Sequence, residues 1–395
     1  MITKETIIKK SKELLDEVIA HRRHLHAHPE ISQNEKETRA YICSVLESYN
    51  ISYKLFKNHY GVLADIKAKN ASKKVVALRA DTDALPIKEL NDVPYKSKYE
   101  GIMHACGHDA HSASLLGVAK ILNDLRDNFE GTVRLLFQPS EEKYPGGALL
   151  MLNDGVLKNP DVNVIFAQHV LPTLETGKVG VKSGYAMAST DEVFITVKGK
   201  GGHGATPELN IDPVVIGAQI IVQLQQIVSR KAPPQIPTVL SFGRFIADGK
   251  TNIIPDTAHL EGTVRTFNEE WRLQIHTLIN KICTTTAEAM GAHCEVRIDK
   301  GYPFLINNDL LTDRFKEYAT AYLGKDNVSD IDLRMTAEDF AYYSQVIPSC
   351  FYRLGIRNAE KGIVSNIHSA TFDIDEKALE TGVGLMCWVA LKELE

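Results

Sequence analysis

Three short apolar segments in the first half of the chain constrain its fold more than any other feature. They cover residues 74–81, 132–137 and 162–167, and helical patterns at 109–125 and 146–153 separate them. Short apolar strands that alternate with helices are typical of a mostly parallel sheet flanked by helices. We therefore predict an α/β protein built on such a sheet.

Side chains suited to chemistry follow all three predicted strands. Asp81 and Asp83 stand at the end of the first strand, Glu141 and Glu142 follow the second, and His169 follows the third. In parallel α/β sheets, ligands bind beyond the carboxyl ends of the strands. This edge of the sheet is therefore the predicted functional site.

The segment Met103–His111 adds a cysteine and several histidines just before a predicted helix. On an extended backbone Cys106 and His108 project to the same side, because side chains alternate along a strand. A thiolate and an imidazole placed together bind borderline-soft metal ions such as zinc. The alternative is a histidine-rich helix N-terminus with Asp109 as its cap.

The whole set of potential ligands favours two metal ions over one. A single catalytic ion takes three protein ligands and a water, whereas two ions share a bridging ligand and need more groups. Neighbouring glutamates on a strand point apart, so we predict that one binds metal and the other acts as general base. The candidates are Cys106, His108, Glu141, Glu142, His169 and His368, with Asp81 and Asp83 nearby.

The pattern changes at about residue 191. Strand, helix, strand, strand, helix and strand are predicted in that order up to residue 299, and Gly291 stops the second helix. This order is that of the split βαβ, or ferredoxin-like, unit. We therefore expect a catalytic domain formed by residues 1–185 and 299–395, with a domain inserted at 186–298.

Apolar periodicity predicts further helices at 5–27, 35–49 and 376–394. Asn34 is a suitable cap for the second of these helices. His24, His26 and His28 alternate near the end of the first helix and look like a metal site. Helical geometry spreads them around the axis, so we expect a structural role for them.

The composition of the chain restricts its possible binding partners, but it says little about the reaction. With a net charge of −5, the chain has no basic excess of the kind that binds nucleic acid or an anionic membrane. Its first residues lack the apolar region of a signal peptide, and no apolar run reaches the ~20 residues of a membrane span. Six cysteines without paired spacing fit a reducing environment, so we expect a cytoplasmic protein.

Gly199, Gly201 and Gly204 have the spacing of a dinucleotide-binding fingerprint between a strand and a helix. Pro207 interrupts the approach, however, and no acidic residue ends a second strand about 20 residues further on. A nucleotide site is therefore not favoured. His203 in this glycine loop is interpreted as a mobile catalytic or cross-subunit residue, with a plain turn histidine as the alternative.

A series of short motifs extends in order along nearly the whole chain. They are Arg22-Arg-x-Leu-His-x-x-Pro-Glu30, Arg79-Ala-Asp-Thr-Asp-Ala-Leu-Pro86, His104-Ala-Cys-Gly-His-Asp109, Phe137-Gln-Pro-x-Glu-Glu142, Gly201-Gly-His-Gly204, Thr251-Asn-Ile-Ile-Pro255, Gly262-Thr-Val-Arg265, Glu338-Asp-Phe340 and His368-Ser369. This series resembles the amidohydrolase branch of the dinuclear metal aminoacylase/carboxypeptidase family. That branch includes N-acyl-amino-acid amidohydrolases, hippurate hydrolases, auxin-conjugate hydrolases and N-acetyldiaminopimelate deacetylases.

The resemblance implies a zinc-peptidase-like fold and the hydrolysis of an amide bond in an N-acyl amino acid or a small peptide with a free carboxylate. It also implies two divalent metal ions, zinc or manganese. Their ligands would be Cys106 as the bridge, His108, Glu142, His169 and His368. Glu141 would be the general base and later the general acid.

The inserted domain resembles the lid and dimerisation domain of the family, which implies a homodimer or a higher homo-oligomer. Asn252 and Arg265 would contact the substrate, and the guanidinium of Arg265 is suited to a carboxylate. His203 would stabilise the oxyanion in the site of a partner subunit.

Two departures from the family pattern affect these assignments. Other branches carry His-x-Asp where this chain has Asp81-Thr-Asp83, so both aspartates are interpreted as residues behind the ligands. After Glu142 the chain reads Lys143-Tyr-Pro-Gly146, where many relatives are glycine-rich. The acyl group and the amino acid of the substrate therefore stay open.

Two alternative functions are also open at this point. One is a thiol hydrolase in which Cys106 is the nucleophile and His108 the base, which leaves the glutamates, His169 and His368 without a role. The other is a scaffold protein that binds metal without turnover, for which a closed, four-coordinate site would be expected.

Overall fold

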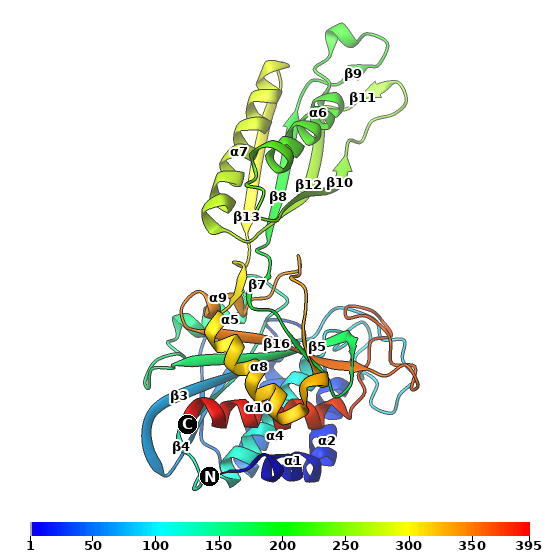
Figure 1. Ribbon diagram of the computed structural model, residues 1–395. Helices are drawn as coiled ribbons and strands as arrows, with labels where there is room; N and C mark the ends of the chain where they lie inside the picture. The colour runs from blue at the N-terminus through cyan, green and yellow to red at the C-terminus, as the bar shows by residue number, and fades with distance from the viewer. Residues whose placement is uncertain (1) are drawn as a thin grey trace. The chain divides into compact units, whose positions relative to one another are not determined.

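The computed structural model describes residues 2–395, apart from the side chains at positions 70–72. The chain folds into two compact units, which are drawn in Figure 1. Unit 1 consists of Met1–Ala186, Ile306–Leu333 and Asp339–Glu395, and unit 2 of Met187–Leu305 and Arg334–Glu338. Unit 2 thus ends later in the sequence than the insertion expected at 186–298. It also includes the separate short segment Arg334–Glu338.

Unit 1 is built on an eight-stranded, mostly parallel sheet, which confirms the predicted fold class. From one edge to the other, the strands are β1 (Tyr53–Leu55), β2 (Val62–Lys67), β4 (Glu130–Gln138), β3 (Asn70–Asp81), β5 (Val164–Glu175), β16 (Ser349–Arg357), β6 (Val179–Val181) and β15 (Val328–Asp330). The central strands β4, β3, β5 and β16 run parallel to one another. Asp81 pairs with Gln138, so the carboxyl ends of β3 and β4 are level.

Helices cover both faces of this sheet. They are α1 (Lys4–Glu13), α2 (Leu15–Ala27), α3 (Lys36–Ser48), α4 (His108–Asp124), α5 (Gly147–Asn153), α8 (Asp309–Leu323), η3 (Lys325–Asn327), α9 (Ala341–Ser344) and α10 (Ala378–Leu394). In Figure 1, α4 and α10 lie below the sheet, whereas α5 and α9 lie above it. Within the described residues, no helix is long and apolar enough to cross a membrane.

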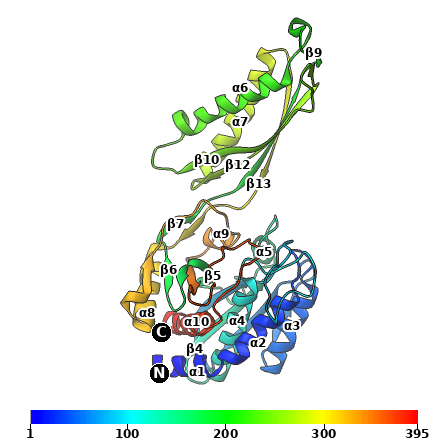
Figure 2. The same cartoon turned by 90° about the vertical axis from the view of Figure 1, so that its right-hand side faces the viewer.

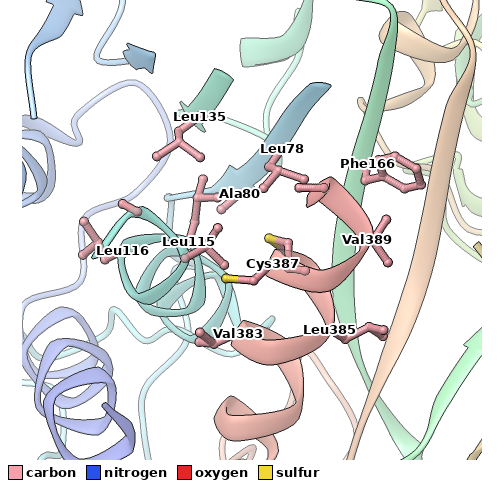
Figure 3. Packing of buried hydrophobic residues seen from close by; sticks show 14 of the residues in the cluster. Leu78, Ala80, Leu115, Leu116, Leu135, Phe166, Val383, Leu385, Cys387 and Val389 are labelled. Carbon is pink, nitrogen blue, oxygen red and sulfur yellow. The ribbon is translucent and has the colours of Figure 1, made fainter. Parts of the chain in front are cut away.

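The core of unit 1 is formed by α4 and α10 against the central strands. Leu115 and Leu116 of α4 and Val383 and Leu385 of α10 are fully or almost fully buried. Figure 3 shows these side chains together with those of β3, β4 and β5. Because α4 is buried along most of its length, its first turn is held firmly at the edge of the sheet.

Unit 2 has the order β-α-β-β-α-β that the sequence predicts. Its antiparallel sheet runs β10 (Thr238–Ile246), β12 (Thr257–Thr266), β8 (Asp191–Lys198) and β13 (His293–Lys300). The helices α6 (Pro213–Gln226) and α7 (Glu269–Ala289) pack on one face of it, as Figure 2 shows. Asp212 and Asn268 cap these two helices through their side chains.

Shorter elements complete the chain. In unit 2 they are β9 (Gly202–His203), η1 (Pro207–Leu209), η2 (Ile227–Lys231) and β11 (Ile253–Ile254). Two further strands, β7 (Gly184–Met187) and β14 (Leu305–Asn307), pair with each other where the chain passes from one unit to the other.

Two helix predictions near the N-terminus are wrong in detail. The helix expected at 5–27 is divided at Leu14 into α1 and α2, although the backbone bonds from Leu14 to Lys10 and from Val18 to Leu14 continue across the division.

Asn34 is not the cap of α3. The carboxylate of Glu30 accepts the backbone N–H groups of Glu37 at 3.1 Å and Thr38 at 2.8 Å instead. A tight turn, closed by the bond from Asn34 N–H to the Ile31 carbonyl, brings Glu30 back to the start of the helix.

The third apolar strand does not end at His169 as expected. β5 continues to Glu175, because β16 pairs with it along almost its whole length. Arg79 of β3 pairs with Ala167 of β5, so two residues further along each strand Asp81 and His169 are level. His169 therefore lies in mid-strand but still reaches the edge where β3 ends.

Candidate metal centre

Gly107 forms the turn between Cys106 and His108. Its φ of 90° is left-handed and α4 begins at the next residue, so the expected extended segment is wrong. A side chain here would also place a Cβ 2.6 Å from Cγ2 of Val170. Glycine alone satisfies both the backbone angle and the close approach to β5.

Two overlapping groups of potential ligands share Cys106. Cys106, His108 and His169 form one group and Cys106, Glu142 and His368 the other, and within each group the ligand atoms lie within 4.8 Å of one another. Sγ of Cys106 is 3.4 Å from Nε2 of His169, and Oε1 of Glu142 is 3.1 Å from Nε2 of His368. Cys106 is therefore common to two groups of potential ligands.

The glutamate pair lies in a loop and not on a strand. β4 ends at Gln138, and a bond of 3.1 Å from Gly147 N–H to the Ser140 carbonyl closes the loop. Glu141 and Glu142 form a further group of atoms within 4.8 Å with His108. The strand geometry assumed from the sequence is therefore wrong, and both glutamates reach the same centre.

His368 reaches the centre from the loop before α10. Its backbone is left-handed, with φ of 60°, and its N–H donates to the carbonyl of Ala105 at 2.7 Å. Its side chain is the most exposed of the candidate ligands, with 49% of its surface accessible. The hydrogen bond to Ala105 connects His368 directly to the segment that contains Cys106.

The donors in this centre fit a pair of divalent cations. Nε2 of His108 and Oε1 of Glu142 are buried and make no hydrogen bond, although the two atoms are only 4.0 Å apart. The contact of 3.1 Å between Glu142 and His368 likewise lacks hydrogen-bond geometry. Buried polar atoms without a partner are costly, and a cation would satisfy them. Sulfur, imidazole and carboxylate donors together suit zinc and similar ions.

Asp83 and a backbone carbonyl orient the two buried imidazoles. Nδ1 of His108 donates to Oδ1 of Asp83 at 3.1 Å, and Nδ1 of His169 donates to the carbonyl of Val170 at 2.8 Å. Each ring therefore presents Nε2 to the centre. Oδ2 of Asp83 also accepts the backbone N–H of Glu142 at 3.0 Å, which ties the glutamate loop to the same group.

Asp81 is engaged by other partners. Its Oδ2 accepts Nη1 of Arg79 at 2.5 Å, and its Oδ1 lies 2.6 Å from Nδ1 of His111. Nε2 of His111 accepts the N–H of Val170 at 2.9 Å, so its proton is on Nδ1 and is donated to Asp81. Asp81 thus connects the end of β3 to the backbone beside His169.

Burial and neighbouring charges shift the pKa values of the side chains in the centre. Burial lowers the pKa of a histidine, yet the Asp81 carboxylate and Cys106 raise the pKa of His108 well above its usual value. Burial and Arg353 lower the pKa of His169 well below its usual value, which keeps it neutral. Burial also raises the pKa of the Cys106 thiol, the opposite of what an activated thiol nucleophile needs.

A buried ionic network supports the first turn of α4. Oδ2 of Asp109 accepts Nε of Arg22 at 2.9 Å and lies 2.7 Å from Nδ1 of His26. The other ring nitrogen of His26 is 3.2 Å from Glu89. His26 therefore has the structural role expected for it, and Asp109 pairs with α2 and does not cap α4.

Unit 2 carries the remaining predicted site residues. His203 lies in β9 opposite Ile253 of β11, and Gly204 N–H donates to the carbonyl of Asn252 at 2.9 Å. His203 and Asn252 are therefore on neighbouring exposed segments of this unit. Arg265 on β12 is partly buried, lines a groove of about 480 Å³ on the sheet, and has a buried Nη1 without a hydrogen-bond partner.

The glycines of the apparent nucleotide fingerprint have a packing explanation. A Cβ on Gly199 would lie 2.1 Å from the Ile211 carbonyl oxygen, and one on Gly201 would lie 2.4 Å from that of Ile254. These positions need glycine because other backbone segments of unit 2 approach them closely.

Sequence reasoning assigns no role to Arg79 and His111. Arg79 is fully buried, and besides Asp81 it binds Gln138 at 2.9 Å and Asp339 at 2.8 Å. An arginine inside an apolar strand is a signal for such a network, because a buried guanidinium requires partners. The sequence gives no comparable signal for the hydrogen bond between His111 and Asp81.

The model of peptidase family M20/M25/M40 matches residues 77–392. The chain belongs to this family. It is therefore a metallo-hydrolase that acts on amide bonds, which confirms the function implied by the motifs. Neither the thiol hydrolase nor the scaffold without turnover is favoured.

Members of the family resemble the chain over most of its length. The N-acyl-L-amino acid amidohydrolase of Geobacillus stearothermophilus is 44% identical over 308 residues, which is 78% of this chain and 82% of that protein. The N-acetylcysteine deacetylase of Bacillus subtilis (strain 168) is 40% identical, with 95% of this chain and 96% of that protein covered. The crystal structure of the B. subtilis YXEP protein, a dinuclear metal-binding peptidase of the M20 family, has a TM-score of 0.81 at 36% identity and covers 97% of this chain and 99% of that one.

The turn at Gly107 leads to a test of the centre. Gly107→Ala is expected to weaken metal retention by at least about tenfold, because the added methyl group displaces Val170 and with it His169. Metal content after dialysis against a weak chelator measures this loss. Gly101→Ala is a matched control, since its φ is 83° but nothing lies within 4 Å of its Cβ. Equal losses in both variants would contradict the packing argument.

Proposed function

We propose that this enzyme hydrolyses N-acyl amino acids, or short peptides with a free carboxylate, at a centre of two divalent ions. The observation that carries the proposal is the buried cluster in which Cys106 belongs to two ligand groups and Glu141 lies beside them. The substrate names of the amidohydrolase and the deacetylase among the relatives support this class. Zinc or manganese is the proposed metal, and a cysteine ligand favours zinc.

The grouping of donor atoms supports a division of the ligands. Cys106 would bridge the ions, with His108 and His169 on one side and Glu142 and His368 on the other. When bound, such ions polarise the substrate carbonyl and lower the pKa of a bound water from 15.7 to about 7. Asp81 and Asp83 would stay behind the ligands, since each is engaged by neighbouring donors.

Glu141 is the proposed proton carrier. It is only 7% exposed, and its carboxylate lies in the group with His108 and Glu142. From there it would accept a proton from the attacking water and later donate one to the leaving amine nitrogen. Because Glu141 would carry both protons and is not a proposed metal ligand, its substitution would lower turnover more than metal binding.

The residues of unit 2 would bind the substrate and complete the site. The guanidinium of Arg265, which lines the groove on the sheet, is suited to a substrate carboxylate, and Asn252 would make a further polar contact. His203 would donate to the oxyanion in the site of a partner subunit, which requires a homodimer or a larger assembly. All six cysteines are free, which supports a reducing compartment such as the cytoplasm.

The first test is a panel of substrates. Protein stripped with a chelator and refilled with zinc or manganese is assayed with N-acetyl amino acids, N-benzoyl amino acids and dipeptides. Activity is expected to disappear on stripping and to return with metal, and the panel ranks the acyl groups and amino acids. Tight metal binding without hydrolysis of any amide would contradict the proposed substrate class.

Substitution of the two adjacent glutamates separates their roles. Glu141→Gln is expected to lower kcat by about 10²–10⁴-fold with unchanged metal content, because it removes the proton carrier and keeps the shape. Glu142→Gln is expected to lose metal, because it removes a ligand. Near-full turnover by Glu141→Gln with both ions bound would show that another group carries the proton.

Hybrid assemblies test the role of His203. His203→Ala and Glu141→Gln are each expected to be nearly inactive alone. If His203 acts in the partner's site, co-refolding the two variants in equal amounts restores about a quarter of the sites, since half of the dimers are mixed and each has one intact site. No recovery, with mixed dimers verified by two affinity tags, would indicate that His203 acts within its own subunit or not at all.

A further inference from the structure

Ser140, the residue before the proposed proton carrier, has a conformation that side-chain-bearing residues rarely adopt. Its φ is 56°, in the left-handed region, where a Cβ crowds the following carbonyl. Such a residue persists only if its surroundings hold it. The backbone conformation of Ser140 sets the positions from which the side chains of Glu141 and Glu142 project.

All polar groups of Ser140 have partners. Its N–H and its hydroxyl both donate to Oε1 of Glu35, at 2.7 and 2.8 Å, and its hydroxyl oxygen accepts the N–H of Gln33 at 2.8 Å. Its carbonyl accepts the N–H of Gly147 at 3.1 Å. Glu35 therefore supplies the acceptor for two of these bonds from a segment more than 100 residues away in the sequence.

Glu35 does not cap the helix that it precedes. It stands at the N-cap position of α3, but its side chain makes no capping bond, since Glu30 binds the first-turn N–H groups. It is 1% exposed, and Oε2 has no hydrogen-bond partner. Among the described residues, no lysine, arginine or histidine forms an ion pair with it.

This burial is unfavourable for the carboxylate. Desolvation and the nearby Asp83 carboxylate raise the pKa of Glu35 to about 7, despite the bonds from Ser140. A buried carboxyl without a cation destabilises a fold, and such features gather at functional sites.

The turn that contains Glu35 is itself held in place. Ala84, just after β3, donates its N–H to the Glu30 carbonyl at 2.8 Å. Ser32 donates its hydroxyl to Oδ2 of Asp83 at 2.6 Å. The turn is therefore attached to β3 and to the group that orients His108.

We propose that Glu35 is a positioning residue for catalysis: through Ser140 it fixes the loop from which Glu141 approaches the substrate. The inference rests on the proposed function of Glu141, but the role of Glu35 is to set its direction and not to transfer a proton. A displacement of about 1 Å in such a group is enough to lower turnover by about 10²-fold.

The test compares two glutamates of the same turn. Glu35→Leu removes the acceptor of both Ser140 bonds, which a glutamine oxygen would retain, and is expected to lower kcat by about 10–100-fold with KM and metal content unchanged. Glu30→Leu is the matched control, since Glu30 accepts two backbone N–H groups but does not touch the loop. It is expected to lower the thermal midpoint and leave kcat unchanged.

Two readouts separate positioning from general stability. The combined variant Glu35→Leu/Ser140→Ala is expected to be no slower than Glu35→Leu alone, because both changes break the same connection. Amide exchange of residues 139–147 in metal-free protein is expected to quicken at least about tenfold in Glu35→Leu and to stay unchanged in Glu30→Leu.

The outcomes keep this inference distinct from the proposed function. Unchanged kcat and unchanged exchange in Glu35→Leu, together with an inactive Glu141→Gln, would overturn the role of Glu35 alone. An active Glu141→Gln would overturn the proposed proton carrier, and quickened exchange in Glu35→Leu would then still establish that Glu35 holds the loop.

Discussion

The carboxylate of Asp83 joins three separate parts of the chain at one point. Its Oδ1 accepts from His108 at the start of α4, and its Oδ2 accepts from Ser32 in the N-terminal turn and from the backbone of Glu142. These donors lower the pKa of Asp83 although burial opposes ionisation. The ring of His108 and the loop of the glutamates are thus oriented by one group, and the spacing of the candidate ligands depends on it.

Around this point the protein buries several charged side chains that form ion pairs with one another. Arg79, Asp81 and Asp339 are fully buried and form a chain of ion pairs between β3 and the loop before α9. Unpaired buried charges would cost several kcal/mol each, so such a network forms only when its members are in place together. Within the centre itself, Nε2 of His108 and Oε1 of Glu142 remain without hydrogen-bond partners, at the place where cations are proposed to bind.

Much of this arrangement follows from local patterns. The alternation of apolar strands and helices identifies the parallel sheet, and the residues at the strand ends indicate its candidate functional edge. Two of the errors occur where a distant segment decides the local geometry, and a third where a neighbouring turn does. β16 extends β5 past His169, Val170 and the left-handed angle confine Gly107, and Glu30 displaces Asn34 as the cap of α3. None of these contacts leaves a periodic signal in the sequence.

The sequence by itself determined the α/β class and the family, because these depend on composition, spacing and residue chemistry, and it supplied a set of candidate metal ligands. Only the tertiary structure decided that Glu141 and Glu142 both reach His108 from one loop, that His111 holds Asp81 against the backbone beside His169, and that Glu35 holds Ser140. Contacts between residues tens to hundreds of positions apart arise from packing of the whole core. A hydrogen bond forms only when packing brings its two atoms to within about 3 Å, and no local pattern specifies that distance.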